Sequence, residues 1–183
     1  RGLRLIALAA AVVGSSAIVG AEDWPQFRGP ARDGVSRETG LLRQWPAGGP
    51  KVLWTIPVGQ GYAGAAILGG RVYHNDYDES KNEWRVYARS LADGKEIWRH
   101  TEARVIRPNH AITRTVPAVD GKYVFSFDPK LGLHCLDAKT GKQVYSERLG
   151  SRLHHASPLL VNGLIYCLAD DGTTYVIRPG DDL

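Results

Sequence analysis

The segment Asp93-Gly94-Lys95-Glu96-Ile97-Trp98 decides the fold, because its pattern recurs along the chain. Thr140-Gly141-Lys142-Gln143-Val144-Tyr145 is a second copy, and Lys51-Val52-Leu53-Trp54 matches the last four positions. The lysines of the three copies, at 51, 95 and 142, are 44 and 47 residues apart. Glycine takes the positive φ of a tight hairpin at little cost, so the two complete copies predict a turn that leads into a strand.

A second element recurs between these copies. It is an apolar strand, a turn centred on glycine, and a strand rich in β-branched and aromatic residues, seen at 65–73, 117–125 and 158–166. Together the two elements form a four-stranded meander that repeats about every 41 to 47 residues, which is typical of a β-propeller blade. The expected strands cover residues 63–68, 71–76, 84–91 and 95–100, then 112–119, 122–127, 132–137 and 142–147, and finally 156–161, 164–169 and 173–178.

The predicted fold class is therefore all-β, a β-propeller of four-stranded antiparallel blades. The blades are expected at about 62–101, 109–149 and 155–183, which amounts to two and three-quarter blades. Known propellers have about four blades or more, so the ring is expected to be incomplete and the chain to be an N-terminal fragment. The remaining blades would then be partners of these, and a strand at 51–56 would complete the last blade of the closed ring.

The first 21 residues predict a secretory signal peptide. Arg1 and Arg4 precede the uncharged run 5–19, and small residues up to Ala21 suit cleavage by a signal peptidase. The alternative is a membrane anchor, but this run is shorter than the roughly 20 residues that a spanning helix needs. The expected domains are a signal peptide at 1–21, a lead-in at 22–50 and the partial propeller at 51–183, exported to the periplasm or the extracellular space and not membrane-spanning after cleavage.

The charge of the chain argues against a nucleic-acid partner, and its two cysteines leave two possibilities open. The chain has 23 Lys and Arg against 19 Asp and Glu, and removal of Arg1 and Arg4 lowers the net charge from +4 to +2. The remaining basic residues are scattered among acidic ones, so a nucleic-acid partner is not expected. Cys135 and Cys167 lie in separate expected strands, where they are either two buried thiols or, in an exported protein, a pair.

The two complete turn copies and their closing aromatic residues resemble the repeat of pyrroloquinoline quinone (PQQ) dehydrogenases and their relatives, which include the lipoprotein of the outer-membrane barrel-assembly machinery. The segment 23–30 also resembles the start of exported PQQ-like propellers. The resemblance implies that a closing Trp docks between blades against the Gly turn of its neighbour, with a weaker dock where Tyr145 replaces Trp. The docking positions it implies are Trp54, Trp98, Gly94, Gly141 and Tyr145.

The resemblance also implies what a PQQ dehydrogenase would need: an adjacent Cys-Cys disulfide, a calcium held by Glu, Asn and Asp, and an Asp base. The sequence contains no Cys-Cys pair. We therefore assign no catalytic residue, no metal ligand and no evident cofactor. PQQ with calcium belongs only to the alternative interpretation, a quinoprotein-type oxidoreductase whose cofactor residues lie in other blades.

The candidate ligand-binding residues lie in the loops that enter the innermost strands, because these loops surround the channel of a propeller. Imidazole, guanidinium and phenol groups at the channel mouth suit an anionic or sugar-like ligand; the alternative is that the histidines only cap strand ends. The predicted function is a non-enzymatic scaffold for protein or saccharide binding, with a partner of the barrel-assembly type as a third possibility. The candidate residues are Tyr62, Asn109, His110, Arg114 and His155.

Overall fold

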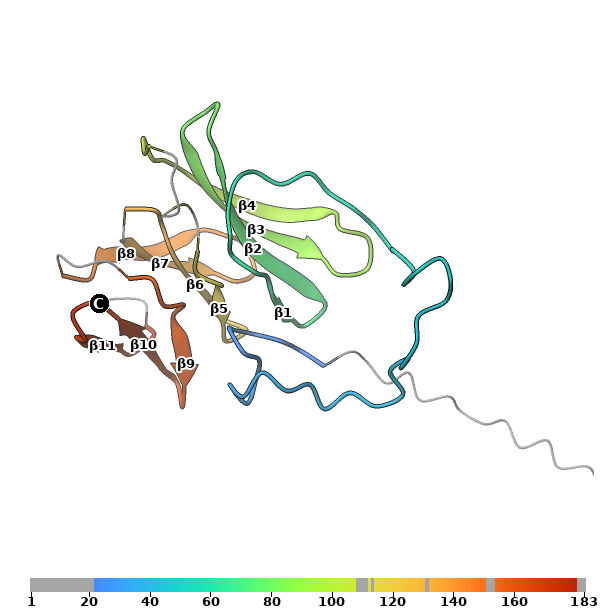
Figure 1. The fold of residues 1–183 in the computed structure, drawn as a ribbon. Coiled ribbons are helices and arrows are strands. Elements are labelled where there is room, and N and C mark those ends of the chain that lie inside the picture. The colour runs from blue at the N-terminus through green and yellow to red at the C-terminus, as the bar shows by residue number, and fades with distance from the viewer. Residues whose placement is uncertain (1–21, 108–111, 113, 131, 151–153, 181–183) are drawn as a thin grey trace, which may run out of the picture.

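The computed structural model describes residues 22–107, 112, 114–130, 132–150 and 154–180, and over these ranges the chain forms three antiparallel sheets (Figure 1). The first sheet has the order β1-β2-β3-β4, with strands Ala66–Leu68, Arg71–Asp78, Glu83–Ser90 and Glu96–Ala103. The second has the order β5-β6-β7-β8, with strands Ala118–Val119, Tyr123–Phe127, Gly132–Asp137 and Gln143–Arg148. The third has the order β9-β10-β11, with strands Leu159–Val161, Leu164–Leu168 and Thr174–Ile177.

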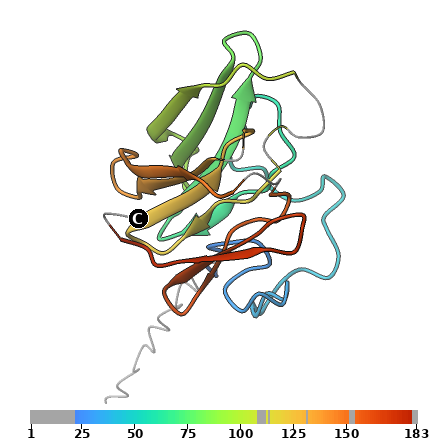
Figure 2. The ribbon, with the colours of Figure 1, turned by 90° about the vertical axis from the view of Figure 1, so that its left-hand side faces the viewer.

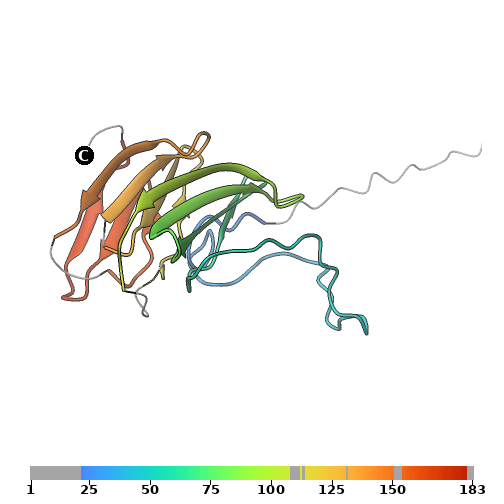
Figure 3. The same cartoon turned by 90° about the horizontal axis from the view of Figure 1, so that it is seen from above.

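The three sheets follow one another in chain order, as the views from the side and from above show (Figures 2 and 3). The fold is thus all-β, and its sheets of four, four and three strands are partial propeller blades, which confirms the predicted fold class. Among the residues that the structure describes, no helix is long and apolar enough to cross a membrane.

The repeat extends to the irregularities of the strands. The turn glycines Gly94 and Gly141 have φ angles of 71° and 73°, in the region that disfavours other residues. The register of β3 against β4 shifts after Ala88, and that of β7 against β8 shifts after Cys135. Both shifts lie six residues before the turn glycine, so the two sheets share a β-bulge as well as a turn.

The innermost strands β1, β5 and β9 are shorter than predicted, with three, two and three residues. Pro117 and Pro158 stand immediately before β5 and β9 and lack the N–H that a longer ladder would need. Residues 51–56 adopt no regular structure. The strand predicted there was assigned to the last blade of a closed ring, which the described residues do not form, so it stays a prediction.

The lead-in takes part in the fold by crossing the innermost strands. The backbone of Trp24 exchanges two hydrogen bonds of 2.8 Å with Ile67 in β1. The carbonyl oxygen of Pro25 accepts a 2.9 Å hydrogen bond from the N–H of Val119 in β5. Gln26 Oε1 accepts a 2.8 Å hydrogen bond from the N–H of Leu160 in β9. Three consecutive residues therefore tie one strand of each sheet together.

Two apolar clusters fill the spaces between neighbouring sheets. The cluster between the first and second sheets, which we call the first junction, includes Trp84, Trp98 and Leu136. The cluster between the second and third sheets, the second junction, includes Phe125, Cys135 and Ile165. Residues 134 and 136 of β7 face the first junction, while 133 and 135 face the second, as the alternation of a strand requires.

Candidate functional site

A cavity of about 380 Å³ opens where the lead-in meets the loops before the innermost strands. The loops before β1, β5 and β9 each contribute to its wall, so all three sheets position the site. The N–H of Val116 donates a 3.0 Å hydrogen bond to Ser157 Oγ, which joins two of these loops. The side chains that characterise the wall are Trp24, Phe27, Arg28, Tyr62, Arg114 and Ser157.

The lead-in side of this cavity is held in place by a tight turn. Gly29 has a φ of 78°, and a Cβ atom there would lie 2.8 Å from the ring of Trp24. The N–H of Gly29 donates to the carbonyl oxygen of Gln26, and Gln26 is itself buried by the innermost strands. Arg28, next to this glycine, donates a 3.1 Å hydrogen bond from Nη2 to the carbonyl oxygen of Asp33. The turn thus fixes the backbone position from which the Arg28 side chain extends.

Cationic and aromatic groups dominate the chemistry of the cavity. Tyr62 is 68% exposed and Phe27 is 52% exposed, so both rings offer a face to a ligand. Arg114 donates from Nη1 to His155 Nδ1 at 2.8 Å, and His155 Nε2 lies 3.2 Å from Asp170 Oδ2. Guanidinium groups form charge-assisted, bidentate hydrogen bonds with carboxylates and phosphates, so the site suits an anionic ligand.

The structure brings some of the predicted ligand-binding residues together. Tyr62 and Arg114 line the same cavity, and His155 contacts Arg114 from beside it. Asn109 and His110 lie outside the described residues. Phe27 and Arg28 were not among the predicted site residues, because nothing local to the motif at 23–30 shows that it folds back onto the innermost strands.

The predicted docking tryptophans make the same contact twice. Trp54 donates from Nε1 to the carbonyl oxygen of Leu91 at 2.9 Å, and a Cβ on Gly94 would lie 2.8 Å from its ring. Trp98 donates to the carbonyl oxygen of Ala138 at 3.0 Å, and a Cβ on Gly141 would lie 2.6 Å from its ring. Each tryptophan therefore lies flat against a glycine turn of the following sheet.

Tyr145 occupies the equivalent position of the second sheet, and the turn that it would meet follows β11, where residues 181–183 lie outside the described part of the chain. Burial, followed by the neighbouring thiols of Cys135 and Cys167, raises the pKa of the Tyr145 hydroxyl above its usual range. The tyrosine thus points its polar end at two sulfur atoms within the second junction.

The two cysteines are buried and not bonded to each other. Burial raises the pKa of the Cys167 thiol to about 12, so the thiol is protonated at neutral pH. The residues present therefore do not fit the adjacent disulfide that the resemblance to PQQ dehydrogenases implies.

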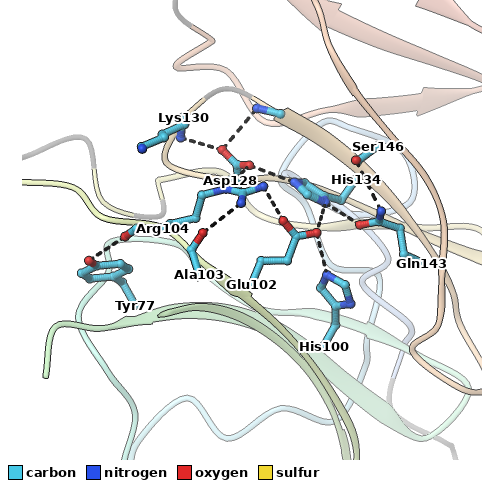
Figure 4. Close-up of polar contacts among 11 residues, drawn as sticks. Tyr77, His100, Glu102, Ala103, Arg104, Asp128, Lys130, His134, Gln143 and Ser146 are labelled. Carbon is cyan, nitrogen blue, oxygen red and sulfur yellow. Dashed lines mark hydrogen bonds and ion pairs between the residues drawn. The ribbon is translucent and has the colours of Figure 1, made fainter. Parts of the chain in front are cut away.

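A separate polar cluster lies in the first junction (Figure 4). Asp128, which follows β6, accepts a 2.8 Å hydrogen bond from Arg104 Nε and lies 2.9 Å from His134 Nε2. Its other oxygen accepts from the backbone N–H groups of Lys130 and Gly132. Burial acts to raise the pKa of Asp128, but the hydrogen bonds from His134 and Arg104 outweigh it and lower the pKa to about 2.

The first sheet faces this carboxylate with His100 and Glu102 of β4. These residues alternate along the strand, so their side chains share one face. Glu102 Oε1 lies 3.3 Å from His100 Nε2 and 3.3 Å from His134 Nδ1, while Oε2 pairs with Arg104 (Figure 4). Burial lowers the pKa of His100 below its usual value. A cavity of about 280 Å³ reaches His134 from the solvent.

Comparison with known families gives one match. The family model described as outer membrane protein assembly factor BamB matches residues 82–181, which is more than half of the chain. The matched range begins before β3 and includes the second and third sheets. No curated protein matches the sequence.

Solved structures similar to this chain include an alcohol dehydrogenase and a BamB protein. A quinohemoprotein alcohol dehydrogenase from Pseudomonas putida HK5 is 18% identical, with 71% of this chain and 21% of that chain covered and a TM-score of 0.51. The crystal structure of BamB from Moraxella catarrhalis is 22% identical, with 62% and 32% covered and a TM-score of 0.46. This chain thus spans a third or less of the length of either structure, and at such identity the likeness shows the fold alone.

Proposed function

Because the chain belongs to the family of the outer membrane protein assembly factor BamB, we propose that it is an exported binding scaffold whose cavity holds an acidic segment of a partner protein. The observation that carries this proposal is the meeting of Arg28 and Arg114 with exposed aromatic rings in one cavity. Loops from three sheets and the lead-in build that cavity, so its groups are positioned before a ligand arrives. Preorganised groups lose less entropy on binding.

The chemistry of the cavity supports an extended acidic segment. Its volume of about 380 Å³ suits a few side chains. The guanidinium groups would pair with carboxylates, while Tyr62 and Phe27 would cover the apolar stems between them. The family name of the relatives favours a protein over a saccharide, because assembly factors act on other proteins.

The binding test uses the whole protein and the fluorescence of its tryptophans, since Trp24 stands in the cavity wall. We expect a short Asp/Glu-rich peptide to bind, and Arg114→Gln or Arg28→Gln to weaken binding about tenfold, the loss of one charge-assisted contact. The matched control is Arg43→Gln, an exposed arginine outside the cavity, which should change nothing. A raised salt concentration should weaken binding as well.

Three results would contradict this proposal. Equal affinity of the arginine variants and the wild type would show that the cavity does not bind the peptide. Binding of a uronic-acid oligosaccharide without binding of the peptide would move the function to saccharides. Dye-linked alcohol oxidation after addition of PQQ and calcium would replace the scaffold by the oxidoreductase alternative.

Export is proposed from the leader predicted at 1–21. In a host that secretes the protein, mass spectrometry of the mature chain should find its first residue close to Glu22. A mature chain that retains Arg1 would contradict export by this route. The lead-in starts to pair at Trp24, so cleavage at this point leaves the contacts with the innermost strands intact.

A further inference from the structure

We propose that His100, Glu102 and His134 bind a divalent transition-metal ion, best represented by Zn²⁺, which joins the first sheet to the second. One ligand atom from each side chain lies within 4.8 Å of the other two. Two imidazole nitrogens and a carboxylate oxygen are ligands that zinc prefers. The proposal is independent of the cavity between the lead-in and the loops.

The spacing of the ligand atoms fits a metal of this size. Ligands about 2.1 Å from a tetrahedral zinc lie about 3.4 Å from each other. Glu102 Oε1 lies 3.3 Å from His100 Nε2 and 3.3 Å from His134 Nδ1, so two of the three edges already have the required length. Gln143 Oε1 lies 3.0 Å from His134 Nδ1 and is placed to act as a fourth ligand or to hold a water there.

Asp128, which lies beside His134 Nε2, favours the tautomer of His134 that a metal ligand needs. Asp128 Oδ2 lies 2.9 Å from His134 Nε2, and the other Asp128 oxygen accepts from two backbone N–H groups, so the carboxylate is placed as the acceptor of a proton on Nε2. This leaves the lone pair of Nδ1 directed at the oxygens of Glu102 and Gln143. A lone pair that faces two oxygens is unfavourable unless a cation stands between them, either a second proton on the imidazole or a metal ion. A carboxylate behind a ligating histidine is the usual arrangement in zinc sites.

The surroundings supply the remaining requirements of a metal site. Arg104 holds Glu102 through Oε2 and Asp128 through Oδ2, which leaves Glu102 Oε1 directed at the two nitrogens (Figure 4). The ring of Trp84 packs 4.6 Å from that of His134 and 6.1 Å from that of His100, so both rings are supported by packing. The carboxylates of Glu102 and Asp128 share the single guanidinium of Arg104, so these three side chains carry a net negative charge that favours a cation. The 280 Å³ cavity provides an entry path to His134.

The first test measures zinc affinity of the whole protein, free of any histidine tag, by competition with a chromophoric chelator. We expect one zinc per chain, and we expect Glu102→Gln to weaken binding at least a hundredfold because it removes a ligand at constant size. Glu147→Gln is the matched control: it lies on the wall of the same cavity but outside the three ligands, and should change affinity less than twofold.

The second test does not depend on any variant. Cobalt(II) bound to the wild-type protein should show the intense visible absorption of a tetrahedral site, and zinc should bleach it and raise the melting temperature. Absence of stoichiometric zinc binding would overturn the proposal. So would zinc binding that survives Glu102→Gln in a variant whose circular dichroism shows it to be folded, or binding that is lost instead in His155→Gln, which would place the ion at the exposed His155–Asp170 pair.

Discussion

The first junction is closed by a tryptophan, whereas the equivalent position of the second junction holds a tyrosine. Trp98 lies against Gly141 and donates to the carbonyl oxygen of Ala138, so its ring packs on the turn and its N–H forms a hydrogen bond with it. Tyr145 has no indole N–H and turns its hydroxyl towards two thiols, those of Cys135 and Cys167. The first and second sheets share their strands, turn and bulge, but their closing aromatic residues place their polar groups differently. We expect the first junction to depend on its aromatic dock far more than the second does.

The largest expected effect is that of Trp98→Ala. Removal of a side chain that is 7% exposed should lower the free energy of unfolding by about 3–5 kcal/mol, because it empties the space above Gly141. The carbonyl oxygen of Ala138 keeps a donor, since Arg71 Nη1 lies 2.8 Å away, so the cost is mainly one of packing. Urea unfolding of wild type and variant measures it, with Trp98→Phe as the milder control. A loss below about 1 kcal/mol would show that the ring does not hold the junction together.

Gly141→Ala should cost less than the loss of the ring but more than the same change at Gly172, a glycine of the β10–β11 turn that no ring covers. Both glycines have a positive φ, 73° and 86°, which strains alanine by about 1–2 kcal/mol. Only Gly141 also faces a ring 2.6 Å from the new Cβ, which adds a clash of about 1–3 kcal/mol. Equal destabilisation of the two variants in urea unfolding would contradict the close packing of the Trp98 ring on Gly141.

The smallest effect is expected for Tyr145→Phe. The hydroxyl is buried and its neighbours are thiols, which are weak hydrogen-bonding partners. Its removal should therefore change the free energy of unfolding by less than about 1 kcal/mol, in either direction. Chemical denaturation detects a change of this size, and a loss above about 2 kcal/mol would show that the second junction depends on a polar contact instead.

Much of the fold was predictable because its signals are local. The turn glycines, the spacing of the repeats and the strand patterns all lie within single sheets, and the outer strands agree closely with the structure. The shortening of β5 and β9 follows from Pro117 and Pro158, which are local signals as well, although the predicted strands ran through them. The strand predicted at 51–56 stays a prediction, because a strand needs a neighbour and the blade expected to supply one is not formed by the described residues.

The sites were harder to predict, because they arise from contacts between sheets. Tyr62 and Arg114 share a cavity, as their equivalent places before β1 and β5 suggested, but the lead-in that completes it comes from far along the chain. His134 lies in the middle of a predicted strand, where nothing marks it as a site residue. Its contact with Glu102 depends on how two sheets pack against each other. The available signal was that His100 and Glu102 alternate in one strand. This pattern is too common to predict a metal site unless a third ligand from another strand is known.

The most direct measurement of blade docking is a double-mutant cycle between Trp98 and Gly141. With the ring removed, Gly141→Ala keeps its backbone strain but loses its clash, so the double variant should be more stable than the sum of the single losses by about 1–2 kcal/mol. The same cycle between Trp54 and Gly141, which belong to different docks, should be additive within about 0.5 kcal/mol. Additive losses for Trp98 and Gly141 would contradict the claim that this ring and this turn hold the first two sheets together.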